Sequence, residues 1–193
     1  MMKLPNIGEP TWDGAAKRKS ASDVAIRALM PVHAEAYRQL MLRALQDFPA
    51  SFGVSHEEVQ AQALGDVADR LRGLDQCGEI VLGAFDGGGE LLGVVGLRRM
   101  SLVKMRHKAV VGRMYVVRAS QRMGLGKRLL EAVVKAARDV PGIEQLSLVV
   151  HEDNVGARVL YTSLGFTPFG VEPRELKIDG RYHNSVHMWL ALD

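Results

Sequence analysis

The most constraining feature of the sequence is a short glycine-containing segment that joins an apolar run to an amphipathic stretch. Met114-Tyr115-Val116-Val117 is typical of a strand, and Gln121-Arg122-Met123-Gly124-Leu125-Gly126 follows it after Arg118-Ala119-Ser120. A helical stripe then runs up to Pro141-Gly142, with apolar residues at Leu129, Leu130, Val133, Val134 and Ala137. Free N–H groups at the start of a helix converge on one place, where the helix dipole adds positive potential. The segment therefore predicts a phosphate-binding loop.

Glycine suits this loop for a steric reason. A Cβ at Gly124 or Gly126 would keep phosphate oxygens away from the main chain, or would demand strained torsion angles. Two nucleotide-binding motifs fit poorly, because the segment lacks the Gly-Lys-Ser/Thr ending of a P-loop and follows an antiparallel hairpin instead of the first strand of a Rossmann unit. Taken alone, the segment is also compatible with a tight strand-to-helix turn.

The remaining apolar patterns predict one α/β domain with a mixed sheet. Turn and breaker residues separate the elements, above all the hairpin turn Asp86-Gly87-Gly88-Gly89, Pro49 after the first helix and Gly165 after the last. Strands are expected at 24–29, 79–85, 90–102, 107–117, 146–150, 166–171 and 182–192, the last two joined by a loop. Helices are expected from Pro31 to Leu45, over 55–71, after Gly126 and over 154–164.

Composition limits the classes of protein but selects none. The 193 residues, 47% hydrophobic and 24% charged, fit an ordinary domain over 22–193, with 1–21 as a poorly ordered extension that lacks a signal-like or membrane-spanning run. The net charge of +3 suits an anionic small molecule at least as well as a nucleic acid. The single Cys77 is expected to be a plain thiol, and no cysteine/histidine spacing resembles a zinc site. We therefore expect a reducing, cytoplasmic location and no metal.

A second motif follows about thirty residues after the loop. It is Asn154-Val155-Gly156-Ala157-Arg158-Val159-Leu160-Tyr161-Thr162-Ser163-Leu164-Gly165-Phe166. At this point the chain resembles the GNAT superfamily of acyl-CoA N-acyltransferases. The family pattern Gln/Arg-x-x-Gly-x-Gly/Ala matches 121–126, and Asn-x-x-Ala-x-x-Leu-Tyr-x-x-x-Gly-Phe matches 154–166. Arg118 stands where proline is common and Arg122 where a second glycine is common, but neither change removes a main-chain N–H.

The resemblance implies a mixed, mostly antiparallel sheet of about seven strands, with a splay between the fourth and fifth strands and about four flanking helices. It also implies acetyl-CoA as the cosubstrate, with its pantetheine arm in the splay. The implied cofactor-binding residues are Met114, Val116, Val117, Gln121, Arg122, Met123, Gly124, Leu125, Gly126, Lys127, Asn154 and Tyr161. The N–H of Val116 would polarise the thioester carbonyl, and the Tyr161 hydroxyl would act as general acid on the sulfur, unless it only packs beside pantetheine.

The implied activity is acetyl transfer to a primary amine of a small molecule by direct attack in a ternary complex. The alternatives are acetylation of a protein N-terminus or lysine, and a CoA-binding module without turnover. Glu57, Glu58 and His151 are weak candidates for the general base, beside a water chain. The acceptor pocket is expected from 48–71 and 172–187. Edge strands also allow a homodimer, whereas no nucleic-acid or membrane partner is expected.

Overall fold

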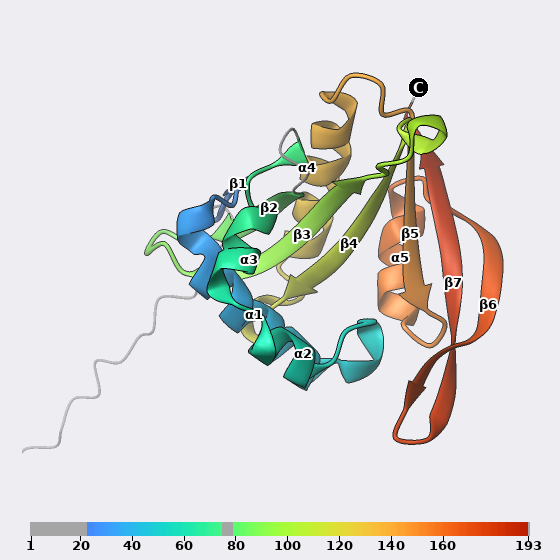
Figure 1. The fold of residues 1–193 in the computed structure, drawn as a ribbon, viewed down its shortest axis with the longest axis horizontal. Coiled ribbons are helices and arrows are strands. Elements are labelled where there is room, and N and C mark those ends of the chain that lie inside the picture. Colours follow the sequence, from blue (N-terminus) through green and yellow to red (C-terminus); the bar gives the residue numbers. More distant parts are fainter. Residues whose placement is uncertain (1–22, 75–78, 193) are drawn as a thin grey trace, which may run out of the picture.

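A mixed sheet of seven strands forms the centre of the protein. The computed structural model describes residues 23–74 and 79–192 (Figure 1), so Cys77 and the expected extension 1–21 lie outside the described residues. The strand order is β1-β2-β3-β4-β5-β7-β6, and every neighbouring pair is antiparallel except β4 and β5. The strands are β1 Ala25–Ala28, β2 Ile80–Phe85, β3 Leu91–Arg99, β4 Lys108–Val116, β5 Gln145–His151, β6 Thr167–Ile178 and β7 Arg181–Ala191. The expected sheet is confirmed.

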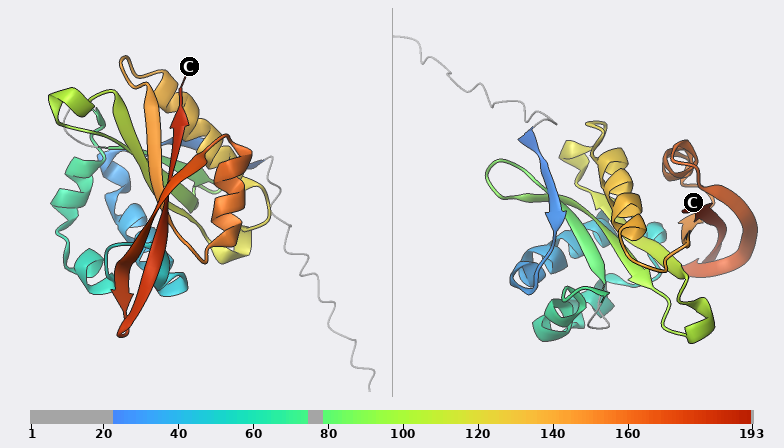
Figure 2. Two further views of the ribbon diagram at one scale, coloured as in Figure 1. Left: turned by 90° about the vertical axis from the view of Figure 1, so that its right-hand side faces the viewer. Right: turned by 90° about the horizontal axis from the view of Figure 1, so that it is seen from above.

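Helices cover both faces of this sheet (Figure 2). They are α1 Ala34–Asp47, α2 His56–Ala61, α3 Leu64–Arg70, α4 Leu125–Arg138 and α5 Val155–Ser163, with short 3-10 turns at η2 Pro31–His33, η3 Pro49–Ser51, η5 Val103–Met105 and η6 Arg118–Ser120. Alternate residues of β2 belong to different cores: Val81 packs with α1 to α3, whereas Leu82 packs with α4. None of the described helices combines the length and apolarity that a membrane crossing needs.

The sheet opens between β4 and β5, as expected. These two strands pair only over three residues each, from Lys108 opposite Gln145 to Val110 opposite Ser147. Beyond that point β5 stays paired with β7, while β4 follows β3 and diverges (Figure 1). A bulge in β4 accompanies the divergence, because the register against β3 shifts between Val94 and Gly96 and Arg113 has a φ of 54°. The gap leaves one edge of each strand available to a ligand.

The helix expected over 55–71 is wrong as a single element. Ser55 caps α2 as expected, with its hydroxyl accepting from the Glu58 N–H at 3.1 Å, but Gln62 and Ala63 are extended and separate α2 from α3. The carbonyl of Gln62 accepts from Arg38 at 3.3 Å and its side chain accepts from Arg70 at 3.4 Å. In a continuous helix the Gln62 carbonyl would accept from the Asp66 N–H, which here donates to the Ala63 carbonyl at 3.1 Å.

Two strand ends also differ from the prediction. The strand expected over 90–102 ends at Arg99, since Leu102 and Val103 are exposed. The strand expected to end at residue 171 continues to Ile178, where a loop was predicted. A register shift between Glu172 and Leu176, with Arg174 at a φ of 61°, accommodates Pro173, which has no N–H for the ladder. The extension is mostly exposed and polar, so it lacks the apolar pattern that predicts a strand.

Candidate active site

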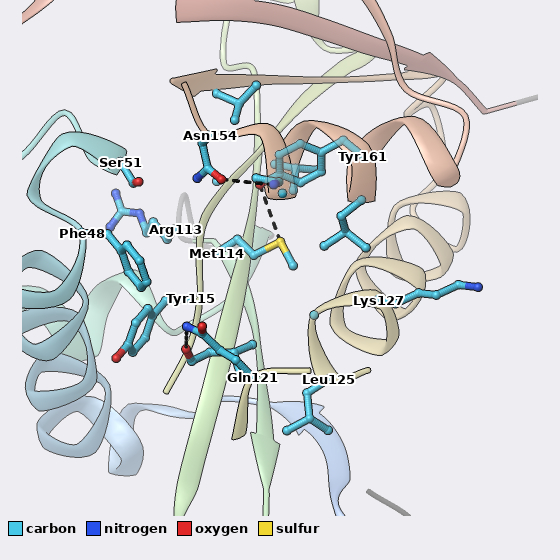
Figure 3. Close-up of a pocket in the computed structure, with 18 of the residues that line it drawn as sticks. Phe48, Ser51, Arg113, Met114, Tyr115, Gln121, Leu125, Lys127, Asn154 and Tyr161 are labelled. Carbon is cyan, nitrogen blue, oxygen red and sulfur yellow. Dashed lines mark hydrogen bonds between the residues drawn. The ribbon is translucent and has the colours of Figure 1, made fainter. Parts of the chain in front are cut away.

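A cavity of about 570 Å³ lies in the gap between β4 and β5 (Figure 3). Its walls come from both strands, the loop before α4 with the start of that helix, one side of α5 and the corner between α1 and α2. The structure brings most of the predicted cofactor-binding residues together along this cavity: Met114, Val116, Gln121, Arg122, Gly124, Leu125, Gly126, Lys127, Asn154 and Tyr161. Val117 and Met123 are not among the residues that line it.

The loop at one end of the cavity has the geometry of an anion site. Gly124 caps α4 with a φ of 75°, in the left-handed region that favours glycine. The first helical hydrogen bond runs from the Arg128 N–H to the Gly124 carbonyl at 3.1 Å. By their position, the N–H groups of Leu125, Gly126 and Lys127 therefore have no acceptor within the helix. These donors and the positive end of the helix dipole favour a bound phosphate.

The open edge of β4 presents main-chain groups to the same cavity. The Val117 N–H donates to the Leu92 carbonyl at 2.9 Å, on β3, and the Val117 carbonyl accepts from Ser120 at 2.9 Å. Both main-chain groups of Val117 are thus engaged within the protein, so its predicted cofactor contact has no support from this geometry. Main-chain groups alternate sides along a strand, so those of Met114 and Val116 face the gap. In agreement, the Val116 carbonyl accepts from the Gln121 side chain at 2.9 Å, which pins the loop to the strand.

Tyr161 and Asn154 enter the cavity from α5. Tyr161 is 9% exposed, and its hydroxyl donates to the Met114 sulfur at 3.6 Å. Burial raises the pKa of Tyr161 to about 12, so the phenol is protonated at neutral pH. Asn154 caps α5, with Oδ1 accepting from the Ala157 N–H at 3.1 Å. Because the cap uses Oδ1, the donors that Asn154 can offer to a ligand are those of Nδ2.

Two of the three candidate bases lie away from this cavity. Glu57 and Glu58 are exposed and are not among its lining residues. Glu58 completes the cap of α2 by accepting from the Ser55 N–H at 2.7 Å. Hydrogen bonds from its own main-chain N–H and from Ser55 lower the pKa of Glu57, which makes it a weaker base. The structure therefore gives no support to either residue as the general base.

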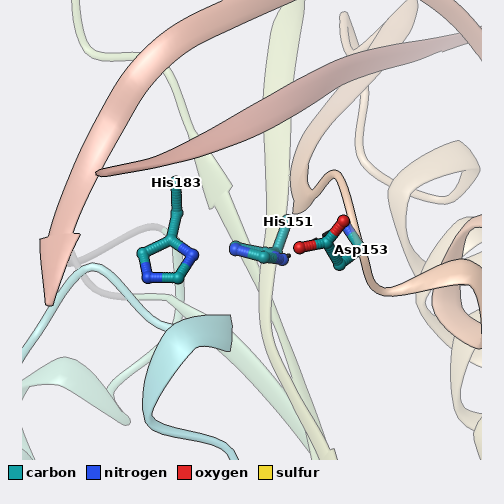
Figure 4. A group of neighbouring side chains, drawn as sticks. All are labelled: His151, Asp153 and His183. Atoms are coloured by element: carbon teal, nitrogen blue, oxygen red, sulfur yellow. Dashed lines mark hydrogen bonds between the residues drawn. The ribbon is translucent and has the colours of Figure 1, made fainter. Parts of the chain in front are cut away.

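His151, the third candidate, lies at the cavity and belongs to a cluster with Asp153 and His183 (Figure 4). One potential ligand atom from each residue lies within 4.8 Å of the others. However, His151 Nδ1 accepts from the Asp153 N–H at 3.2 Å, so a neutral ring carries its proton on Nε2. That protonated nitrogen cannot bind a metal at the same time. His151 Nε2 is buried and has no hydrogen-bond partner among the described residues, and in this tautomer it is a donor.

A charged cluster that local sequence patterns do not show holds the corner between α1 and α2. Tyr115 donates to Asp47 Oδ2 at 2.7 Å, and Arg118 Nε lies 2.8 Å from Asp47 Oδ1. The Arg118 guanidinium also lies over the Phe48 ring, 4.8 Å from its centre. Burial and the hydrogen bond to Asp47 raise the pKa of Tyr115, while the hydrogen bonds from Tyr115 and Arg118 lower that of Asp47. The cluster fixes the segment that carries Phe48 over the cavity.

We expect Asp47→Asn to lower the melting temperature at pH 7. The folded-state pKa of Asp47 is below its ordinary value, so its contribution to stability is present at neutral pH and is lost as the pH falls from about 4 through that lower value. Thermal unfolding should therefore show a difference in melting temperature between wild type and variant that is smaller at pH 3 than at pH 7. Asp139→Asn is the control, because its pair with Lys135 is exposed and contributes little. A difference that is equal at both pH values would contradict this account.

Known proteins share this fold, and one family profile matches the chain. The profile of the Acetyltransferase (GNAT) family matches residues 38–166. A GNAT-family acetyltransferase from Streptococcus pneumoniae is 20% identical, with a TM-score of 0.80 over 88% of this chain and 99% of that one. A phosphinothricin acetyltransferase from Sinorhizobium meliloti, solved with acetyl-CoA, is 17% identical, with a TM-score of 0.76 over 88% of this chain and 89% of that one.

A ribosomal-protein-alanine N-acetyltransferase from Brucella melitensis is 20% identical, with a TM-score of 0.74 over 87% of this chain and 99% of that one. No curated protein sequence is significantly similar to this chain. At these identities the solved structures establish the fold, and the family profile, which covers both sequence motifs, establishes the family. The chain belongs to the Acetyltransferase (GNAT) family.

Proposed function

We propose that this protein transfers the acetyl group of acetyl-CoA to a primary amine of a small molecule by direct attack in a ternary complex. One observation carries the proposal. A single cavity joins the phosphate loop before α4, the open edge of β4 and the buried hydroxyl of Tyr161. A diphosphate, an extended amide-containing arm and a thioester sulfur need these three features in this order. The S. meliloti relative, solved with acetyl-CoA, supports the choice of cosubstrate.

The described residues would divide the chemistry as follows. The amine nitrogen bonds to the thioester carbon, and the Val116 N–H donates to the oxygen on which negative charge develops. The carbon–sulfur bond then breaks, and Tyr161 donates a hydrogen bond to the leaving sulfur. The N–H groups of residues 125–127 hold the diphosphate, and Arg122 at the loop surface adds a positive charge. The amine loses its proton to solvent, since neither Glu57 nor Glu58 lines the cavity.

A peptide amine is the second candidate acceptor. The B. melitensis relative is named for an acceptor of this kind and has the same fold. A CoA-binding module without turnover is the least favoured alternative, because Tyr161 lies buried within the cavity where catalysis needs a donor.

An amine panel distinguishes these three functions. Purified protein is incubated with acetyl-CoA and single amines, including amino acids, polyamines, aminoglycosides and peptides, and released thiol is measured together with the mass of the product. We expect amine-dependent thiol release with an equal amount of N-acetyl product from at least one small molecule. Release with peptides alone would support the second candidate. Calorimetric binding of CoA without thiol release from any amine would leave only the binding module.

A further inference from the structure

A second cavity, of about 320 Å³, adjoins the first on the side of α1. It lies between α1, the start of α2, α3 and the bulge in β4. Ser51, Phe52 and Arg113 line both cavities, so the two spaces meet at these residues. Figure 3 shows Arg113 on the same side of the first cavity as Ser51. Because Met114 follows Arg113 along β4, the second cavity opens beside the proposed thioester position and is the natural place for the acceptor.

The charged side chains that line this second cavity are all basic. Three guanidinium groups line it, those of Arg38, Arg70 and Arg113, and no carboxylate does so among the described residues. Arg38 pairs with Glu35 at 3.0 Å and Arg113 with Glu79 at 3.2 Å, both from outside the cavity. Each guanidinium has five N–H donors, so these pairs leave donors for a ligand.

Arg70 is the most available of the three cations. Its side chain donates to the Gln62 side chain at 3.4 Å, which is a long contact with a neutral group. The third cation also keeps its charge: burial acts to lower the pKa of Arg113, but Tyr37 and Glu79 outweigh it and raise the pKa above its usual value. Glu35 and Glu79 offset two of the three charges from outside the cavity, and Arg70 is the cation with no carboxylate partner among the described residues.

Two buried polar atoms of the lining residues have no well-formed hydrogen bond among the described residues. They are Nε of Arg38 and the hydroxyl of Tyr37, a residue that is 1% exposed and lies close enough to Arg113 to raise its pKa. A buried polar group without a partner is unfavourable, so such groups beside a cavity favour a polar ligand. A hydroxyl and several guanidinium N–H groups are all donors to one kind of partner, an oxyanion.

We infer that the acceptor is a small amine that also carries a carboxylate or a similar oxyanion, and that Arg38, Arg70, Arg113 and Tyr37 bind this anionic group. The inference rests on the proposed function, because it names the acceptor class of the same reaction. The anion would lie in the second cavity while the amine points past Arg113 to the thioester. Arginine suits this role, since its planar fork matches a carboxylate with two parallel hydrogen bonds.

The positive charges of these arginines also help to deprotonate the acceptor amine for its attack on the thioester. Positive groups near an ammonium disfavour its protonated form and lower its pKa. Neither cavity has a carboxylate among its described lining residues, and the nearest ones, Glu35 and Glu79, weaken this effect only from behind Arg38 and Arg113. An anionic group on the acceptor supplies the binding energy that brings the amine into this positive field.

The test compares acceptors that differ only in the charged group. Thiol release from acetyl-CoA is measured with amino acids, with their primary amides and with aminoalkylphosphonates that have the same side chains. We expect kcat/KM for the acid or the phosphonate to exceed that for the amide by about 10- to 100-fold, mainly through KM. The better of the two anions identifies the oxyanion. Equal values for acid and amide would overturn the inference while leaving the proposed function intact.

Variants connect this preference to the cavity. Arg70→Gln should reduce the ratio of kcat/KM for the acid to kcat/KM for the amide to nearly one. Arg72→Gln should leave this ratio unchanged, because Arg72 pairs with Asp69 at the surface and does not line the cavity. An undiminished ratio in Arg70→Gln would also overturn the inference.

If no amine releases thiol, the proposed function fails, and calorimetry with CoA-saturated protein then tests the inference by itself. If the protein binds the acids but not the amides, and if Arg70→Gln abolishes this binding, the inference is supported. If acids and amides bind equally, the inference is overturned.

Discussion

Replacing Tyr161 by phenylalanine is expected to lower kcat by about 10- to 100-fold with little change in the affinity for CoA, since a hydrogen bond to a developing charge contributes about 1.5–3 kcal/mol. The change removes one oxygen, which contacts the Met114 sulfur, and keeps the edge contact of the ring with Phe166. Stability should hardly change. Stopped-time thiol assays give kcat, and calorimetry gives the affinity for CoA.

The raised pKa sharpens the role of Tyr161. A phenol with a pKa of about 12 is a poor source of a full proton for a thiolate, whose ordinary pKa is about 8.5. The Tyr161 hydroxyl therefore acts by hydrogen bonding to the sulfur. The proton that the released thiol finally carries comes from the amine or from solvent. It follows that kcat should not fall between pH 8 and pH 10 through ionisation of Tyr161.

Tyr182→Phe is the matched control, because Tyr182 is exposed on β7 and stacks under Arg174 outside the cavity. Its kcat should equal that of wild type. An unchanged kcat in Tyr161→Phe would mean that Tyr161 only packs beside the cofactor.

Patterns that lie within one short segment predicted most of the fold, including the two helix starts that border the first cavity. The stripe before Pro141 and the glycines at 124 and 126 placed α4 and its loop, and Asn154 correctly marked the start of α5. Such features follow from local rules, because helix caps and hydrophobic periodicity depend on neighbours a few residues apart.

The acceptor side depends on contacts between distant segments, which no local pattern records. Arg38, Gln62 and Arg70 come from three different helices or their junctions, and their contacts explain why the helix expected over 55–71 breaks where it does. Asp47 meets Tyr115 although 68 residues separate them. Arg113 reaches both cavities because the bulge of β4 places it there, and a φ of 54° for arginine is not a preference that its sequence neighbours reveal.

Replacing Gly126 by aspartate is expected to raise the Kd for CoA by at least about 100-fold without destabilising the protein. Gly126 lines the cavity, and a Cβ there would approach Leu160 and Met114 no closer than 3.4 Å, which is ordinary contact. A carboxylate in the first turn of α4 also interacts favourably with the helix dipole. The substitution should therefore suit the free protein and exclude only an anionic ligand.

Gly126→Asn separates the effect of charge from that of size, because the asparagine side chain has nearly the same shape as aspartate and carries no charge. If the N–H groups of residues 125–127 hold the diphosphate, calorimetry should show much weaker CoA binding for the aspartate variant than for the asparagine variant. At about 4 Å and an effective dielectric constant near 20, two like charges repel by about 4 kcal/mol. Acetyl-pantetheine lacks the diphosphate, so it should bind both variants equally. Equal affinities of both variants for CoA itself would place the diphosphate elsewhere, and the phosphate loop would then be only a strand-to-helix turn.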